Sequence, residues 1–276
     1  MPAAIIAYTT EDAAGSNVAR RLRELYGFEP GEMILEAGVE LRTWDYKGVK
    51  LVELHTRLSN ASEYLSQIPS FAAGLLVIFA SRHKAESGRP AFTVHSTGNW
   101  GADPQWGGNP GELGRTSSRA IASGYKWFSD NPFKEFEVTL EATHHGPSSL
   151  HSPSVFIELG SGEAQWRNAD AGGHLAICAM HVAQNWQNEA GKTAIGIGGT
   201  HYASKFNALE GKAFNFSFIC PKHSLDGFST QLLKQAVGKT QEKVGVIVLD
   251  WKGTTLPQRD AVRTAAQECG LEIVRE

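Results

Sequence analysis

The chain has few cysteines and no long hydrophobic run, and both absences narrow the classes of protein to which it can belong. The three cysteines, Cys178, Cys220 and Cys269, lack the CxxC spacing of zinc ribbons and redox motifs, so we expect buried small side chains. The longest apolar run, Gly74–Ala80, falls well short of the roughly 18–20 residues that cross a membrane. No basic segment followed by an apolar stretch opens the sequence, so no signal peptide is expected. These features predict a cytoplasmic protein without a membrane segment.

A surplus of positive charge is also absent. Lys and Arg number 26 against 29 Asp and Glu, a formal net charge of −3. A protein that binds nucleic acid over its whole surface normally carries a basic surplus, so any polynucleotide partner would be held by a local patch.

Several common enzyme motifs do not occur. There is no GxGxxG loop opening a helix, no GxxxxGK[ST] loop and no GxSxG. These absences argue against a dinucleotide site, phosphate transfer from ATP and an α/β-hydrolase serine nucleophile. Attack by water, assisted by a base or a metal, remains.

Apolar segments of strand length alternate with amphipathic segments of helix length. The expected strands are Pro2–Tyr8, Met33–Ala37, Val49–His55, Leu75–Ala80, Ala91–His95, Phe136–Thr143, Val155–Leu159, Thr193–Gly198, Lys212–Ile219, Val244–Asp250 and Leu271–Val274. The expected helices are Glu11–Tyr26 capped by Thr10, Ser117–Ser129, Ala171–Ala190, Thr230–Val237 and Pro257–Cys269. This alternation predicts an α/β fold with a mostly parallel or mixed sheet and helices on both faces. At 276 residues a single domain is possible, and an insertion or lobe is possible around residues 96–130, where a loop rich in Gly, Pro and Trp occurs.

Histidines and a glutamate stand at the ends of five expected strands. They are His83, His95, the pair His144 and His145, Glu158, and His201. Residues past the C-terminal ends of strands line the ligand crevice of open α/β sheets, so we expect these side chains to meet there. Histidine can exchange a proton near neutral pH or bind zinc, and the spacing alone does not decide between the two roles.

Two local features refine this expectation. His144 and His145 would point to opposite faces if both lay in a strand, so only a turn could bring both rings to one ion. Glu158 lies in an apolar strand, where a buried carboxylate needs a partner. The aromatic residues Trp100, Trp106, Trp166 and Tyr202 either pack or form a platform for an aminoacyl side chain or a nucleobase.

Five motifs together resemble one known family. They are SRH (Ser81–His83), TVHSTGNWG (Thr93–Gly101), THHGP (Thr143–Pro147), ELGSGEAQW (Glu158–Trp166) and GGTHY (Gly198–Tyr202). Their order resembles the D-aminoacyl-tRNA deacylases of archaea and plants. The resemblance implies hydrolysis of the ester between a D-amino acid, notably D-tyrosine, and the 3′-terminal adenosine of tRNA. It also implies zinc, and a core similar to peptidyl-tRNA hydrolase and nucleoside phosphorylases.

The residues and the resemblance together give a set of expected roles. The expected catalytic residues are His95, Asn99, His144, His145, Glu158 and His201, with Asn99 and loop N–H groups receiving the oxyanion. The candidate zinc ligands are His83, His95, His145, Glu158 and His201, and the candidate tRNA contacts are Arg82, Lys84, Arg89, Arg115 and Arg119. We expect a monomer that binds the acceptor end of D-aminoacyl-tRNA and needs no protein partner. The alternatives are an enzyme similar to peptidyl-tRNA hydrolase or nucleoside phosphorylase, and a non-catalytic binder of D-amino acids or nucleotides.

Overall fold

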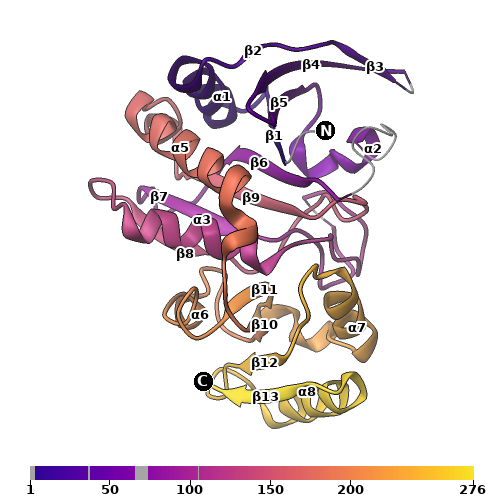
Figure 1. Cartoon of the computed structure of the whole chain (residues 1–276). Coiled ribbons are helices and arrows are strands. Elements are labelled where there is room, and N and C mark those ends of the chain that lie inside the picture. Colours follow the sequence, from indigo (N-terminus) through magenta and orange to yellow (C-terminus); the bar gives the residue numbers. More distant parts are fainter. Residues whose placement is uncertain (1–3, 37, 66–73, 105) are drawn as a thin grey trace.

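The computed structural model describes residues 4–36, 38–65, 74–104 and 106–276, which form two β-sheets with helices packed beside them (Figure 1). The described strands are β1 (Ala4–Thr9), β2 (Glu29–Pro30), β3 (Ile34–Glu36), β4 (Val39–Tyr46), β5 (Val49–Leu54), β6 (Leu76–Arg82), β7 (Ala91–His95), β8 (Glu137–Leu140), β9 (Ser154–Gly160), β10 (Thr193–Ile197), β11 (Asn215–Cys220), β12 (Val246–Leu249) and β13 (Glu272–Arg275). The helices are α1 (Ala13–Tyr26), α2 (Ser62–Leu65), α3 (Ser118–Asp130), α4 (Glu163–Trp166), α5 (Ala169–Asn185), α6 (Ser204–Asn207), α7 (Thr230–Lys239) and α8 (Leu256–Cys269). Short 3₁₀ turns are η1 (Leu58–Asn60), η3 (Trp186–Asn188) and η4 (Lys222–Gly227).

The larger sheet is mixed, and its strand directions decide where the polar residues meet. Its described strands follow the order β2-β4-β5-β1-β6-β9-β7-β8, with β3 paired to β4. β5, β1, β6 and β9 are parallel to one another, whereas β7 runs antiparallel to β9 and β8 follows the direction of β7. The expected α/β class with a mixed sheet is confirmed. The expectation that the site residues share one C-terminal edge is wrong, because β7 and β8 end toward the opposite edge from β6 and β9.

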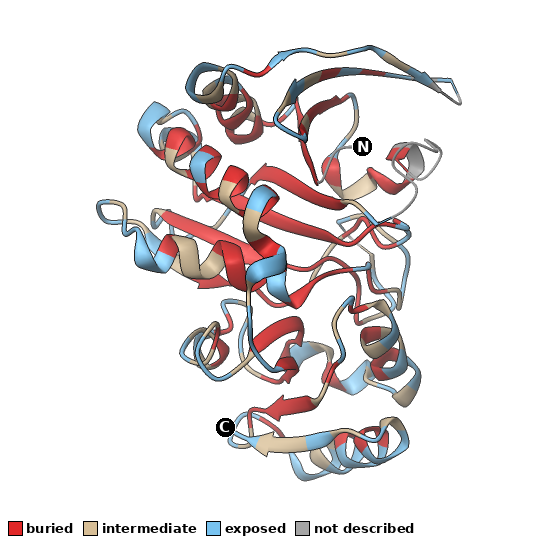
Figure 2. Ribbon diagram, in the orientation of Figure 1, coloured by how far each residue is buried: buried red, intermediate tan, exposed pale blue. Residues whose placement is uncertain are grey.

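Three helices cover one face of this sheet. In Figure 1, α1, α5 and α3 lie side by side in one layer over the central strands. Their apolar residues, such as Val18 and Leu175, join Ile78 and Val155 in one buried core. Figure 2 shows the central strands buried almost throughout. The three helices therefore cover this face of the sheet with apolar packing, and the polar site residues lie on the opposite face.

The cap of α1 differs from expectation. Asp12, not Thr10, caps the helix, because its Oδ1 accepts hydrogen bonds from the N–H groups of Ala14 and Gly15 at 2.8 and 3.0 Å. Its Oδ2 accepts from the Arg82 N–H at 2.8 Å. One buried carboxylate thus caps a helix and fixes the end of β6.

The smaller sheet is parallel, in the order β11-β10-β12-β13, and packs against α7 and α8. The chain leaving β8 joins the two sheets. Thr143 donates its N–H to the Ile219 carbonyl at 2.9 Å, and its hydroxyl accepts from the Ile219 N–H at 3.0 Å. This junction brings the loop after β10, which carries His201, next to the end of β8.

Some strand boundaries depart from the sequence expectations. β4 was not expected, and β8 ends at Leu140 instead of Thr143. Parts of two expected strands, at positions 2, 3 and 37, fall outside the described residues.

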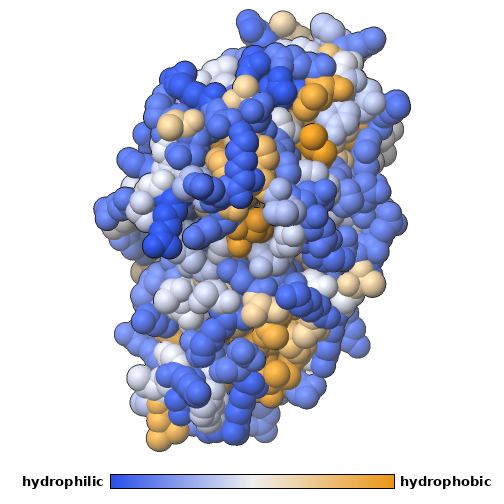
Figure 3. Space-filling model, turned by 90° about the vertical axis from the view of Figure 1, so that its left-hand side faces the viewer, coloured by the Kyte–Doolittle hydropathy of each residue, from blue (hydrophilic) through white to orange (hydrophobic). Residues whose placement is uncertain are grey.

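None of the described helices combines the length and the apolar character that crossing a membrane requires. Figure 3 shows the face of the molecule that lies on the left in Figure 1. This face is mostly hydrophilic, with a few separate hydrophobic areas.

Glu210, which follows α6, is a glutamate whose pKa links the stability of the fold to pH. Its side chain is buried, and Oε2 accepts from the Phe216 N–H at 2.9 Å. Burial raises the pKa of Glu210 well above its ordinary value, so the folded chain keeps a proton that the unfolded chain releases. Stability is therefore expected to fall as pH rises above the unfolded pKa of 4.5.

Glu210→Gln keeps the acceptor for Phe216 and carries no charge. We expect the same melting temperature as the parent near pH 4 and a higher one near pH 8, by roughly 2–4 °C per kcal/mol gained. The exposed Glu86→Gln is the matched control and should change neither value. A difference in melting temperature between variant and parent that does not change from pH 4 to pH 8 would show that the carboxylate ionises in the fold as it does in the unfolded chain.

Candidate active site

Five histidines and two glutamates meet on the face of the larger sheet opposite α1, α3 and α5. We call them the His-Glu cluster: His83, His95, Glu141, His144, His145, Glu158 and His201. His83, His95, Glu141 and Glu158 are buried, whereas the side chains of His144 and His201 are 29% and 41% exposed. The cluster thus has a buried base and an open side.

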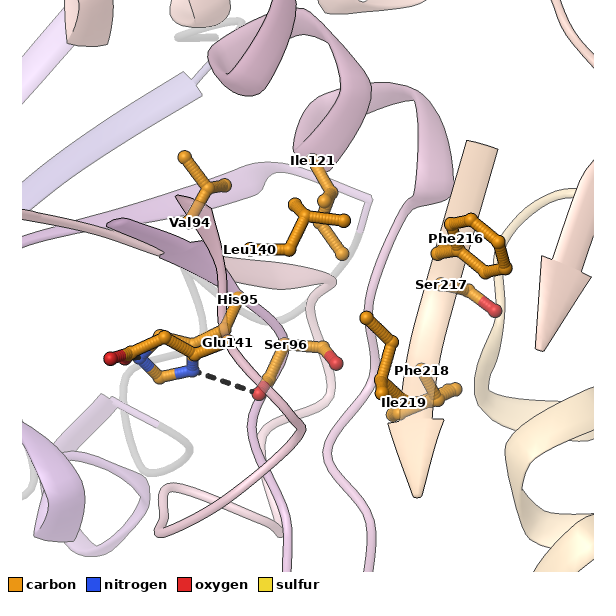
Figure 4. Close-up of a pocket in the computed structure, with 10 residues that line it drawn as sticks. All are labelled: Val94, His95, Ser96, Ile121, Leu140, Glu141, Phe216, Ser217, Phe218 and Ile219. Atoms are coloured by element: carbon orange, nitrogen blue, oxygen red, sulfur yellow. Dashed lines mark hydrogen bonds and ion pairs between the residues drawn. The ribbon is translucent and has the colours of Figure 1, made fainter. Parts of the chain in front are cut away.

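The strand register explains how distant residues come together. Glu158 of β9 lies beside Ser81 of β6 on one side and Thr93 of β7 on the other. Thr93 Oγ1 donates to Glu158 Oε2 at 3.3 Å, and His95, two residues further along, points to the same face. In Figure 4, His95 and Glu141 project together, while Val94 and Leu140 project away. Alternation along β7 and β8 therefore separates the cluster from the core.

Glu141 lies at the centre of the cluster, and the sequence analysis did not identify it. Its Oε1 is 2.9 Å from His83 Nδ1 and 3.5 Å from His201 Nε2. Its Oε2 is 3.7 Å from His95 Nε2 and 3.9 Å from His144 Nε2. One carboxylate therefore contacts four imidazoles that come from four separate segments of the chain.

A turn after β8 brings both adjacent histidines inward, as the sequence required. His145 adopts a left-handed backbone with φ of 43°. The ring centroids of His144 and His145 lie 4.4 and 4.9 Å from that of His95. The prediction that a turn is needed at this pair is confirmed.

Three of the histidines share one hydrogen-bond pattern. Nδ1 donates to the Ser96 carbonyl from His95 at 3.0 Å, to the Ala142 carbonyl from His144 at 2.8 Å, and to the Gly146 carbonyl from His145 at 2.6 Å. Fixing the hydrogen on Nδ1 leaves Nε2 of each ring to face the cluster. Metal-binding histidines commonly show this arrangement.

Burial and neighbouring charges shift the pKa values of the cluster in opposite directions. Burial opposes charge on His83, but the carboxylates of Glu141 and Glu158 outweigh it and raise its pKa to about 11. Burial and the neighbouring His95 lower the pKa of His145 to about 4 and that of His144 well below its ordinary value. Despite burial, the imidazoles of His83 and His95, which lie 3.7 and 3.8 Å from its oxygens, lower the pKa of Glu158 to about 2. The carboxylate of Glu158 and the ring of His83 therefore favour their charged forms, whereas His144 and His145 favour the neutral form.

The cluster fits a zinc ion by its unsatisfied atoms. His95 Nε2 and both carboxylate oxygens of Glu141 are buried and lack a hydrogen bond of acceptable geometry within the described residues. Three sets each place their ligand atoms within 4.8 Å of one another: His95, His144 and His145; Glu141, His144 and His201; and His83, Glu141 and Glu158. Imidazole nitrogens with a carboxylate are a zinc donor set. None of these sets contains a cysteine.

The side-chain amide of Asn99 is not available to donate a hydrogen bond to an oxyanion. Its Nδ2 donates to the carbonyls of Gly107 and Asn109 at 2.9 and 3.2 Å, so both amide hydrogens are engaged inside the glycine-rich loop. That loop reaches the cluster through its backbone, because the Gly98 N–H donates to the His145 carbonyl at 2.7 Å. In this structure Asn99 holds the loop that holds His145.

The five expected tRNA-contact residues do not form one patch. Arg82, Lys84 and Arg89 lie on the segment that leaves β6 beside His83. The Arg115 carbonyl instead accepts from the Ser154 N–H at the start of β9, the opposite end of that strand. Arg119 lies in the first turn of α3 and donates to the Gln187 carbonyl in the helical layer, so its expected place beside the site is wrong.

Cavity size does not locate the site. A cavity of about 10 Å³ between the sheets, lined in part by His95 and Glu141, has room for about one water (Figure 4). A larger hollow of about 280 Å³ lies against Trp100, Pro110 and Leu232, and no ionisable residue lines it. The chemistry therefore points to the open side of the His-Glu cluster.

Other residues singled out in the sequence have structural partners. Trp100 and Trp166 donate their indole N–H groups to the carbonyls of Ile219 and His83. His174 packs against aromatic rings including Phe92 and Trp127, on the helical side. None of these three side chains contributes to the cluster.

The family comparison and the individual relatives point to the same family. The family described as D-aminoacyl-tRNA deacylase matches residues 72–274. The chain is 34% identical over 281 residues to the D-aminoacyl-tRNA deacylase of Thermococcus kodakarensis, covering 99% of both chains. It is 35% identical to that of Hyperthermus butylicus, covering 96% of this chain and 97% of the relative.

Among solved structures, a conserved protein of unknown function, AF0625, aligns with a TM-score of 0.87 at 26% identity, covering 99% of this chain and 95% of its own. A nucleosidase of Campylobacter jejuni aligns with a TM-score of only 0.44 over 66% of this chain. A similarity that low carries no argument, so the expected likeness to nucleoside phosphorylases stays a prediction.

Proposed function

The chain belongs to the D-aminoacyl-tRNA deacylase family, and from that membership we propose that its His-Glu cluster is where the ester of D-aminoacyl-tRNA is hydrolysed. The protein is a hydrolase, and the products are free D-amino acid and tRNA. The main support for this location is the position of Glu141, whose buried carboxylate contacts four imidazoles beside an open surface. Phosphorolysis and binding without turnover, the alternatives open at the sequence level, have no comparable support.

The residues divide by exposure into two roles. His83, His95, Glu141 and Glu158 are buried and orient their neighbours through the contacts described above. His144 and His201 are partly exposed and can reach the substrate. His144 keeps its Nδ1 hydrogen on the Ala142 carbonyl, so its Nε2 is free to bind a metal or to accept a proton from the attacking water.

We propose zinc as the cofactor because the unsatisfied atoms suit it. His144 is common to two of the ligand sets, with His95 and His145 in one and with Glu141 and His201 in the other. Zinc, when bound, would lower the pKa of water and polarise the ester carbonyl. The two buried carboxylates supply the negative charge that a cation needs, and the backbone carbonyls orient the rings.

The tRNA is proposed to lie along the segment that follows β6. Arg82 ends β6, Lys84 follows the buried His83, and Arg89 lies further along the same segment. Cationic side chains here would contact phosphates of the acceptor end and bring the ester to the cluster. We also propose that the protein acts as a monomer in the cytoplasm, where aminoacyl-tRNA is used.

A deacylation assay tests this proposal. We expect the protein to release D-tyrosine from D-tyrosyl-tRNA, to act weakly on L-tyrosyl-tRNA, and to lose activity when a chelator removes the metal. Adding inorganic phosphate should not change the rate. Equal rates on both stereoisomers would contradict the assigned substrate, and full activity after verified metal removal would contradict the zinc proposal.

A further inference from the structure

Tyr202 reaches from the surface to a buried member of the cluster. Its side chain is 39% exposed, yet its hydroxyl lies 3.1 Å from Nε2 of His83, which is buried. The other nitrogen of the same ring, Nδ1, is 2.9 Å from Glu141 Oε1. A chain of contacts thus runs from a central carboxylate through an imidazole to a phenol at the open side.

Both ends of the phenol–imidazole contact are held by the fold. The Tyr202 carbonyl accepts from Thr139 Oγ1 at 2.8 Å and from Asn207 Nδ2 at 3.1 Å. The His83 N–H donates to Leu159, and the Trp166 indole donates to the His83 carbonyl at 3.0 Å. Gly160 leaves room for the ring, because a Cβ there would lie 2.6 Å from it. These contacts hold the backbone of Tyr202 and the ring of His83 in place, and the contact with Nε2 holds the hydroxyl.

Other polar side chains near the cluster are already engaged. Thr93 donates to Glu158, and Ser96 and Thr143 share a hydrogen bond of 2.7 Å. Asn99 uses its amide hydrogens within the loop. Of these groups and Tyr202, only Tyr202 combines a hydroxyl at the cluster with an exposed side chain.

The phenol of Tyr202 can both donate and accept a hydrogen bond. On its inner side it lies 3.1 Å from His83 Nε2, while Nδ1 of the same ring lies 2.9 Å from Glu141 and 3.7 Å from Glu158. Because a hydroxyl hydrogen rotates to suit its partners, the phenol can donate it to an acceptor on the open side.

We propose that Tyr202 is a catalytic residue whose hydroxyl donates a hydrogen bond to the carbonyl oxygen of the scissile ester as negative charge develops there. This inference rests on the proposed function of the cluster. A fixed donor aimed at developing charge stabilises the transition state more than the bound substrate. Tyr202 takes the role that the sequence had suggested for Asn99.

The test compares two hydroxyl deletions. Tyr202→Phe should lower kcat on D-tyrosyl-tRNA by about 10²-fold, the usual loss for one oxyanion donor, with little change in KM. Tyr125→Phe is the matched control, because the Tyr125 hydroxyl donates to the Asn207 carbonyl at 3.0 Å and so supports the same segment without touching the cluster. Its kcat should match the parent. The affinity for an analogue with a 3′-amide in place of the ester should be equal in all three proteins, since no charge develops on it.

Three results would overturn the inference. They are parental kcat in Tyr202→Phe, an equal loss in Tyr125→Phe, and a loss that appears only in KM and in affinity for the amide analogue. In each case a parent that hydrolyses D-tyrosyl-tRNA would leave the proposed function standing. A parent without that activity would remove both.

Discussion

Glu141→Gln is expected to lower kcat for D-tyrosyl-tRNA by about 10²-fold or more, on the scale of a lost catalytic acid or base. The side chain is fully buried, and its two oxygens lie within 4.0 Å of nitrogens from His83, His95, His144 and His201. An amide of the same shape supplies neither the charge nor two acceptors. The variant should also bind less zinc, which metal analysis of the purified protein will measure.

Glu135→Gln is the matched control for this substitution. Glu135 is exposed and lies just before β8. Its activity, zinc content and melting temperature should equal those of the parent. Parental kcat and zinc content in Glu141→Gln would show that the central carboxylate is not part of the reaction.

His201→Ala and His145→Ala are each expected to reduce kcat by about 10²-fold or more. His201 is the most exposed imidazole of the cluster and lies 3.5 Å from Glu141, whereas His145 packs against His95. Their backbone contacts remain in the variants, since the His201 carbonyl accepts from the Ala142 N–H and the His145 carbonyl from the Gly98 N–H. The loss should therefore come from chemistry and not from unfolding, as circular dichroism will show.

The double variant Glu141→Gln, His201→Ala sharpens this test. Residues that act as a unit show non-additive losses, so the double variant should be little worse than either single variant. His223→Ala, at an exposed position outside the cluster, should behave like the parent. Fully multiplied losses would mean that the two residues act independently.

Much of the fold could be predicted because periodicity and turn residues are local. The strands around Leu76–Arg82 and Ala91–His95 and the helix Ala13–Tyr26 follow from apolar patterning. Strand direction depends on partners, and the expectation that the site residues share one C-terminal edge was wrong because β7 runs antiparallel to β9. A signal was present, because residues 83–90 contain no helix and are too few for the crossover that parallel strands need.

The membership of the site was predictable in part. His83, His95, His144, His145, Glu158 and His201 were all named from their places beside strands, and the structure brings them together. Glu141 was missed because it was counted within the strand Phe136–Thr143. Alternation with Leu140 and Ala142 marks it as facing the other way, but its pairing beside His95 depends on the register of β7 and β8, which no local pattern encodes.

The partners of Asn99 and Arg119 were equally hidden from the sequence. Each donates to a backbone carbonyl, Gly107 and Asn109 for the amide and Gln187 for the guanidinium. Residue type suggests a donor, but only the fold shows that the donor is already used.

The central claim is that distant histidines and Glu141 form one centre at which the ester of D-aminoacyl-tRNA is cleaved. A crystal structure with a 3′-amide analogue of D-tyrosyl-adenosine tests it most directly. We predict that the carbonyl carbon of the analogue lies at the open side of the cluster, next to His144 and His201 and within reach of the Tyr202 hydroxyl. An analogue bound in the hollow beside Trp100, or elsewhere away from these side chains, would contradict the account.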